Sequence, residues 1–122
     1  VIKAMRMPKD SDAERELRDK KMQEGYKSAT EIPLKTVEYC CKALGICERI
    51  SKLMDDSMAS DVGSGAHMSI AGAKSAAYNV KINLNSIKDK KYVKETEEKV
   101  ELMLSKCEQL LKSISKNVDE KI

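Results

Sequence analysis

Aromatic residues and histidine are scarce in this chain of 122 residues, which has no Phe, no Trp, four Tyr and one His. Nucleic-acid binding usually combines clustered basic residues with aromatic rings on which bases stack. Here 23 basic residues are offset by 20 acidic ones, and the only dense basic cluster is Lys88, Lys90 and Lys91. The composition therefore argues against nucleic acid as a partner. The single histidine, His67, argues against any site built on a pair of histidines.

The chain also lacks long apolar runs and paired cysteines. No stretch reaches the roughly 18 apolar residues that a membrane span needs, so we expect no membrane partner. The cysteines form a poor disulfide framework and contain no C-x-x-C metal pair; they are Cys40, Cys41, Cys47 and Cys107. We therefore expect reduced, mostly buried thiols in a cytoplasmic protein, and no metal site.

Glycine and proline are sparse as well, with five and two residues, whereas Ala, Leu, Met, Lys and Glu are abundant. This composition favours helices and excludes an all-β sandwich. The sequence has no G-x-G-x-x-G, P-loop, H-E-x-x-H or G-x-S-x-G motif. A length of 122 residues suits one domain. We predict a single all-α domain over residues 1–122, an antiparallel bundle of four helices.

The first half of the chain predicts two long helices on either side of Pro33. Ser11 and Glu14 form an S-x-x-E capping box that starts a helix running to about Ala29. Pro33 lies near the start of the next helix, where the first turn tolerates it. Gly45, in the middle of that helix, suggests a neighbour that passes close. The apolar residues of the second helix follow steps of three and four: Val37, Cys40, Cys41, Leu44, Cys47, Ile50 and Met54.

The second half predicts a helix rich in small side chains and then a helix with a heptad seam. Ser60 can cap a helix that begins near Asp61, and its many Gly, Ala and Ser residues place it at the centre of the bundle or in a subunit interface. Residues 79–85 alternate apolar and polar, which is typical of an extended segment and also fits the end of the helix. Asp89 can cap the final helix, whose seam steps by three and four: Val93, Thr96, Val100, Met103, Cys107, Leu110 and Ile114.

Three polar residues are candidates for chemistry. Asp61 lies at the front of a helix, where the helix dipole favours its ionised form, so the simplest interpretation is stabilisation of the helix N-terminus. Asn79 and Asn83 are four residues apart and share a face in a helix or a strand. Paired amides offer donors and acceptors that do not titrate, which suits the orientation of a polar ring. A cap or turn role explains both asparagines equally well.

Several runs of sequence resemble the cyclodeaminase/cyclohydrolase family of folate one-carbon metabolism. Ser60–Gly63 and Ala76–Leu84 are similar to its S-D…A…N-V-x-I-N-L signature. Arg18 to Gln23 and Ala29 to Leu34 are similar to its R-x4-Q…A-T-x-V-P-L stretch. Val1 to Lys9 resembles the segment after its second or third helix, so we expect the N-terminal helices of the family domain upstream of Val1, outside this chain.

The resemblance implies a dimeric helical enzyme that handles tetrahydrofolate one-carbon units, including polyglutamylated ones, with no cofactor beyond the folate substrate. Asp61 is expected to be catalytic, either moving a proton or balancing a cationic one-carbon centre. Arg18 is expected to meet a glutamate carboxylate, and the lysine cluster to attract a polyglutamate tail. The expected substrate-binding residues are Arg18, Gln23, Asn79, Lys81 and Asn83.

Three functions stay open at this point. A cyclodeaminase closes formiminotetrahydrofolate to 5,10-methenyltetrahydrofolate and releases ammonia, whereas a cyclohydrolase opens the same methenyl ring with water. Nothing in these residues separates the two. A non-catalytic helical assembly module fits the small-residue helix and the heptad seam equally well. The expected absence of the N-terminal helices favours the module, as does Met54-Asp55, which stands where the family often has Gly-Asn. Lys81 stands where many members are apolar, which argues against a catalytic role for this lysine.

Overall fold

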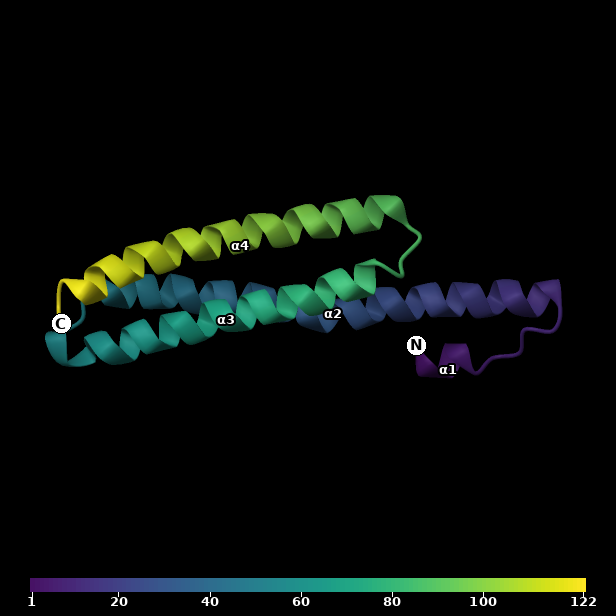
Figure 1. Ribbon diagram of the computed structural model, residues 1–122, viewed down its shortest axis with the longest axis horizontal. Helices are drawn as coiled ribbons and strands as arrows, with labels where there is room; N and C mark the ends of the chain where they lie inside the picture. The colour runs from purple at the N-terminus through teal and green to yellow at the C-terminus, as the bar shows by residue number, and fades with distance from the viewer.

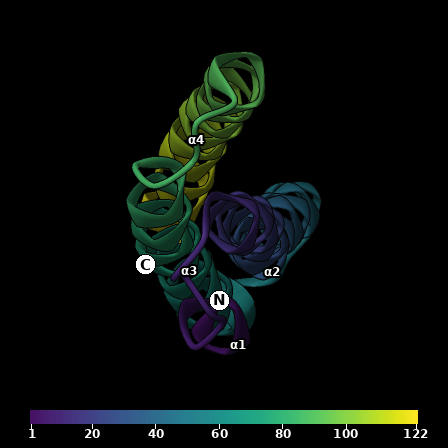
Figure 2. The same cartoon turned by 90° about the vertical axis from the view of Figure 1, so that its right-hand side faces the viewer.

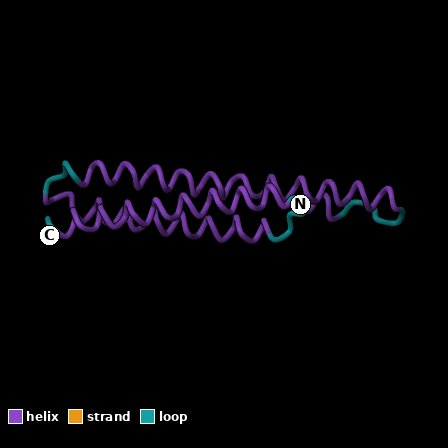
Figure 3. The backbone as a smooth tube through the Cα atoms, turned by 90° about the horizontal axis from the view of Figure 1, so that it is seen from above, coloured by secondary structure: helices purple, strands orange, loops and turns teal.

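The computed structural model describes all residues 1–122 and contains only helices, as the composition predicts. A single turn, α1 (Ile2–Met5), precedes three long helices: α2 (Asp12–Ser51), α3 (Ala59–Leu84) and α4 (Lys90–Asp119). A short 3₁₀ turn, Asp56–Met58, leads into α3. The three long helices lie side by side, and each runs antiparallel to the one before it in the sequence (Figure 1). The backbone tube in Figure 3 has no strand. Viewed from its end, the bundle has a triangular section (Figure 2).

The prediction of two helices around Pro33 is wrong, because α2 runs unbroken through this proline. The Ser11 hydroxyl accepts the Glu14 N–H at 3.2 Å, so Ser11 caps α2 as predicted. The Glu14 carboxylate accepts the N–H of Asp10, one residue before the cap, at 3.1 Å, so the second half of the capping box is shifted by one residue. No cap or break interrupts the helix before Ser51. The N-terminal part of α2 extends beyond α3 and α4, and α1 folds back beneath it (Figure 1).

Small residues let α3 approach both neighbours closely. A Cβ atom on Gly63 would lie 3.3 Å from a methyl carbon of Val118 in α4, and one on Gly72 would lie 3.0 Å from Cys40 Sγ in α2. The helix begins at Ala59, two residues before Asp61, so its predicted start is confirmed, but Ser60 does not cap it. Residues 79–84 are helical, which decides the question left open by their alternating pattern.

The predicted seam of α4 is confirmed, since four of its members are buried: Thr96, Val100, Cys107 and Ile114. Asp89 caps this helix by accepting the Tyr92 N–H at 3.1 Å. Two apolar clusters hold the bundle together. One is centred on Leu44 and Ile114, and the other on Val37, Val80 and Val100.

The structure corrects two expectations about α2. A disulfide joins Cys41 to Cys107 in α4, so these two cysteines are not reduced thiols; Cys40 and Cys47 are free. The expectation of a close neighbour at Gly45 is also wrong, because a Cβ atom there would meet nothing within 4 Å. No helix combines the length and the apolarity required to cross a bilayer.

Candidate functional site

A groove of about 450 Å³ lies between α2 and α3, next to Pro33. All of its lining residues come from α2 and α3. Its lining joins apolar, hydroxyl and amide groups: Ala29, Ile32, Pro33, Thr36, Gly72, Ser75, Ala76, Asn79 and Asn83. The absence of a side chain at Gly72 allows the two helices to come together at this level. The groove therefore brings together two of the predicted substrate-binding residues, Asn79 and Asn83.

Pro33 and Asn83 are linked through the backbone of α2. Proline has no N–H, so the carbonyl of Ala29, four residues earlier, lacks its helical donor. Asn83 Nδ2 donates to this carbonyl oxygen at 3.1 Å. The helix thus remains continuous at Pro33 with the help of a side chain from α3. Asn83 Oδ1 accepts no hydrogen bond from the protein.

Asn79 lies one turn earlier on the same face of α3. Its Nδ2 donates to the Ser75 carbonyl oxygen at 3.2 Å, within the same helix. Its Oδ1 also accepts no hydrogen bond from the protein. The groove therefore carries two amide oxygens that can accept hydrogen bonds from a ligand, on a face that α4 does not cover.

Gln23 and Arg18 lie outside the groove and are engaged with the protein backbone. Gln23 Nε2 donates to the Ser86 carbonyl at 2.9 Å, and Gln23 Oε1 accepts the Lys88 N–H at 2.8 Å. Gln23 thereby ties α2 to the loop between α3 and α4. Arg18 donates from Nε and Nη2 to the Met5 carbonyl, at 3.4 Å each, and so holds the end of α1.

The loop between α3 and α4 is also held to α2 by ion pairs. Lys27 Nζ lies 2.7 Å from an Asp89 oxygen, and Lys88 Nζ lies 2.6 Å from an Asp19 oxygen. The hydrogen bond from Lys27 lowers the pKa of Asp89, and the Tyr92 N–H lowers it further. These ion pairs join the loop to α2, and one of them involves Lys88, a member of the lysine cluster.

Lys81 and Asp61 are separated from the two asparagines. Lys81 lines a different hollow, between α3 and α4, together with Glu97 and Glu101. Asp61 is exposed in the first turn of α3. The 18 residues from Asp61 to Asn79 correspond to about 27 Å along a helix axis, at about 1.5 Å per residue. One chain therefore does not bring Asp61 and these asparagines to the same ligand.

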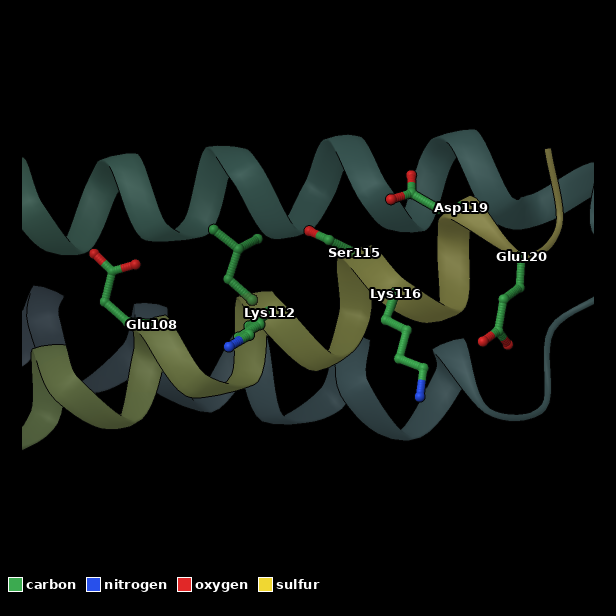
Figure 4. A pocket seen from close by; sticks show the side chains of 7 residues that line it. Glu108, Lys112, Ser115, Lys116, Asp119 and Glu120 are labelled. Atoms are coloured by element: carbon green, nitrogen blue, oxygen red, sulfur yellow. The ribbon is translucent and has the colours of Figure 1, made fainter.

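The largest hollow, about 660 Å³, lies on the outer surface of α4. All seven of its lining residues come from α4 or its C-terminal cap, and only Leu111 is apolar. In Figure 4, Lys116 and Glu120 point away from Asp119, so these charged groups do not converge on one point. We do not assign a function to this hollow. No group of three or more His, Cys, Asp or Glu side chains is placed to hold a metal ion.

The α2 half of the groove does not follow from the sequence prediction. In the predicted arrangement, Ala29 ends one helix and Pro33 begins the next, so the Ala29 carbonyl is not inside a helix and is not expected to lack a donor. The sequence prediction therefore does not identify it as a partner of Asn83. One signal points to it: Tyr26, Thr30 and Val37 keep the helical spacing of three or four through Leu34 and across Pro33. A periodic pattern that continues through a proline indicates an uninterrupted helix with one unpaired carbonyl.

Comparison with known proteins identifies the family to which the chain belongs. Residues 1–102 match the family model described as formiminotransferase-cyclodeaminase. The chain is 30% identical to the methenyltetrahydrofolate cyclohydrolase of Methylorubrum extorquens over all 122 residues, which cover 59% of that protein. It is 32% identical over 108 residues, 88% of the chain, to the formimidoyltransferase-cyclodeaminase of Gallus gallus, of which they cover 20%. The chain thus spans about three-fifths of the bacterial relative and a fifth of the avian one. It belongs to the formiminotransferase-cyclodeaminase family.

Proposed function

We propose that this protein acts in the cytoplasm on tetrahydrofolate one-carbon units, as a cyclodeaminase that closes 5-formiminotetrahydrofolate to 5,10-methenyltetrahydrofolate. The observation that carries the proposal is the groove beside Pro33. There, a chain of this family presents two amide oxygens, from Asn79 and Asn83, that have no partner in the protein. Relatives that match the chain carry the names of a cyclohydrolase and a cyclodeaminase.

The reaction needs orientation more than a new functional group. The folate nitrogen N10 attacks the formimino carbon on N5, which gives a tetrahedral centre that carries an amino group. Protonation of this amino group lets it leave as ammonia, and the N5–C–N10 bridge remains as a cationic methenyl group. When the ring is held so that N10 lies close to the formimino carbon, most of the rate acceleration of ring closure comes from this positioning. Asn79 and Asn83 accept hydrogen bonds from the N–H groups of the pterin and hold it in this way.

The remaining expected residues act on the charged tail of the substrate. We assign to Arg18 and Lys81 the binding of the glutamate carboxylates of the substrate, because both side chains are positively charged and lie outside the groove. Gln23 contributes by fixing the loop that contains Lys88, Lys90 and Lys91. These lysines attract a polyglutamate tail, so affinity for polyglutamylated folate is expected to fall as salt is added.

Asp61 requires a second copy of the chain. Because about 27 Å of helix separates it from Asn79, its proposed role in proton transfer at the groove needs an Asp61 from another protomer. A homodimer is supported by apolar side chains that are 49–75% exposed on α2 and α3: Ile32, Tyr39, Ile46, Met68, Tyr78 and Ile82. Ile32 also lines the groove.

A second candidate is 5,10-methenyltetrahydrofolate cyclohydrolase. It is favoured by the bacterial relative of that name, which matches the full length of this chain. In this reaction, water attacks the methenyl carbon and the bridge opens to a formyl product. The same groove would hold the pterin, and the Asp61 carboxylate of the second protomer would accept a proton from the attacking water.

The near-ultraviolet absorbance of methenyltetrahydrofolate distinguishes the candidates in one experiment. Formation of this band from 5-formiminotetrahydrofolate, faster than in buffer, is expected for a cyclodeaminase. Faster decay of added methenyltetrahydrofolate identifies a cyclohydrolase and overturns the first proposal. The Methylorubrum extorquens enzyme serves as the positive control for decay. If purified protein changes neither signal, both enzymatic proposals fail for residues 1–122, and a non-catalytic helical module takes their place.

A further inference from the structure

The Ala29 carbonyl fixes which way the Asn83 amide faces. Helix α2 offers this oxygen no backbone donor, because residue 33 is proline. A carbonyl oxygen only accepts hydrogen bonds, so the atom of Asn83 that lies 3.1 Å from it must be the amide nitrogen. The amide oxygen is then left over at the groove that Asn83 lines. The identity of residue 33 on α2 therefore determines the orientation of a side chain on α3.

We propose that Pro33 is a positioning residue for the folate ring. By withholding an N–H, it reserves the Ala29 carbonyl for Asn83 Nδ2 and holds Asn83 Oδ1 as an oriented acceptor. This inference rests on the proposed function and deepens it, since a fixed acceptor selects an edge of the ligand that carries N–H donors. In a pterin, that edge is the 2-amino group with the neighbouring ring N–H.

An N–H at position 33 would undo this arrangement. In a Pro33→Ala chain, the new N–H donates to the Ala29 carbonyl and closes the normal helical hydrogen bond. The carbonyl no longer depends on Asn83, so the amide is free to turn. Helix α2 gains stability while the groove loses its oriented acceptor. The two effects have opposite signs, whereas a purely structural role for Pro33 would leave folate affinity unchanged.

A double-mutant cycle tests the inference in the full chain, with Pro33→Ala, Asn83→Ala and the double variant. Thermal unfolding is measured for each protein, and the dissociation constant for 5-formyltetrahydrofolate is measured by calorimetry at a temperature where all four are folded. Pro33→Ala is expected to raise Tm by about 4 °C or more. Asn83→Ala is expected to lower Tm by about 4 °C in the chain that keeps Pro33, and by less than about 1 °C in the Pro33→Ala background.

Folate affinity should show the same coupling. Each single variant is expected to bind 5-formyltetrahydrofolate about tenfold more weakly, and the double variant little more weakly than either. Two matched controls accompany the cycle. Pro8→Ala removes a proline from the connection before α2. Asn85→Ala removes a side-chain amide that makes no hydrogen bond in the structure. Both controls should leave affinity within about twofold of the unmodified chain.

The outcomes separate the inference from the proposed function. If Asn83→Ala lowers Tm equally in the presence and in the absence of Pro33, the link between these residues is refuted. If the Tm coupling appears but Pro33→Ala binds the folate normally, the positioning role is refuted and the proposed function stands. If the unmodified chain does not bind 5-formyltetrahydrofolate, the folate function fails and the inference about its ring fails with it. Coupling in both Tm and affinity supports the inference.

Discussion

The two sides of α2 are built by different means. The side toward α4 is closed by a disulfide between Cys41 and Cys107 and by an ion pair of 2.6 Å between Glu38 and Lys99. The side toward α3 is held by close packing at Gly72 and has an open groove beside Pro33. Covalent and ionic links fix one pair of helices, whereas the other pair packs through small residues and leaves the amide oxygens of Asn79 and Asn83 without a partner in the protein. The first side is a scaffold, and the second can receive a ligand.

Reduction of the disulfide on the scaffold side should have the largest effect on stability. Cys41 and Cys107 are 66 residues apart, so their cross-link restricts the unfolded chain strongly. Loop-closure entropy predicts a loss of about 4 kcal/mol in unfolding free energy when the bond is reduced. Urea denaturation with and without a reducing agent measures this loss. Equal stability under both conditions would contradict a disulfide in solution.

Asp61→Asn tests whether the chemistry at the groove needs a second chain. The variant is expected to lower kcat about 100-fold with an unchanged circular dichroism spectrum, as for the loss of a proton-transfer group. When it is mixed and refolded with Asn83→Ala, random pairing in a two-fold dimer should restore about a quarter of full activity. Full activity in Asp61→Asn alone would remove the proposed role. No recovery on mixing would show that Asp61 and Asn83 do not share a site.

Two glycines, Gly72 on α3 and Gly45 on α2, give a matched pair. A Cβ atom on Gly72 would already lie 3.0 Å from Cys40 Sγ, so Gly72→Leu should cost about 2 kcal/mol and fill the groove. Gly45 has nothing within 4 Å, so Gly45→Ala should stabilise the chain by about 1 kcal/mol. Chemical denaturation and folate binding measure both effects. Folate binding by Gly72→Leu as tight as by the unmodified chain would place the ligand elsewhere.

The smallest expected effect is the pH dependence of the Glu38–Lys99 pair. The hydrogen bond from Lys99 lowers the pKa of Glu38 below its ordinary value of 4.5. The pair therefore contributes stability above about pH 4.5, and this contribution is lost as the pH falls through the lower pKa of the folded state. Because the pair is partly exposed, we expect less than about 1 kcal/mol. Stability curves of the unmodified chain and Glu38→Gln should converge below that pKa. A constant difference from about pH 7 to about pH 3 would contradict this origin.

The candidate site is only partly predictable from the sequence. Asn79 and Asn83 stand out because a spacing of four places both on one face of a helix. The partner of Asn83 on α2 cannot be recognised in the sequence, since Ala29 contributes only its backbone carbonyl oxygen and lies 54 residues from Asn83. Gln23 is expected at the substrate only through the resemblance. Its contacts with Ser86 and Lys88 are long-range and have no local pattern.

The sequence by itself determined the helical class, the caps at Ser11 and Asp89, the seam of α4 and the likeness to the folate family. These features depend on residues a few positions apart, because caps, heptads and motifs are local. Tertiary structure decided that α2 passes through Pro33, that residues 79–84 are helical, and that Cys41 is bonded to Cys107. Each of these outcomes depends on a group from a distant part of the chain: an amide that reaches a free carbonyl, a packed neighbour, or a second sulfur.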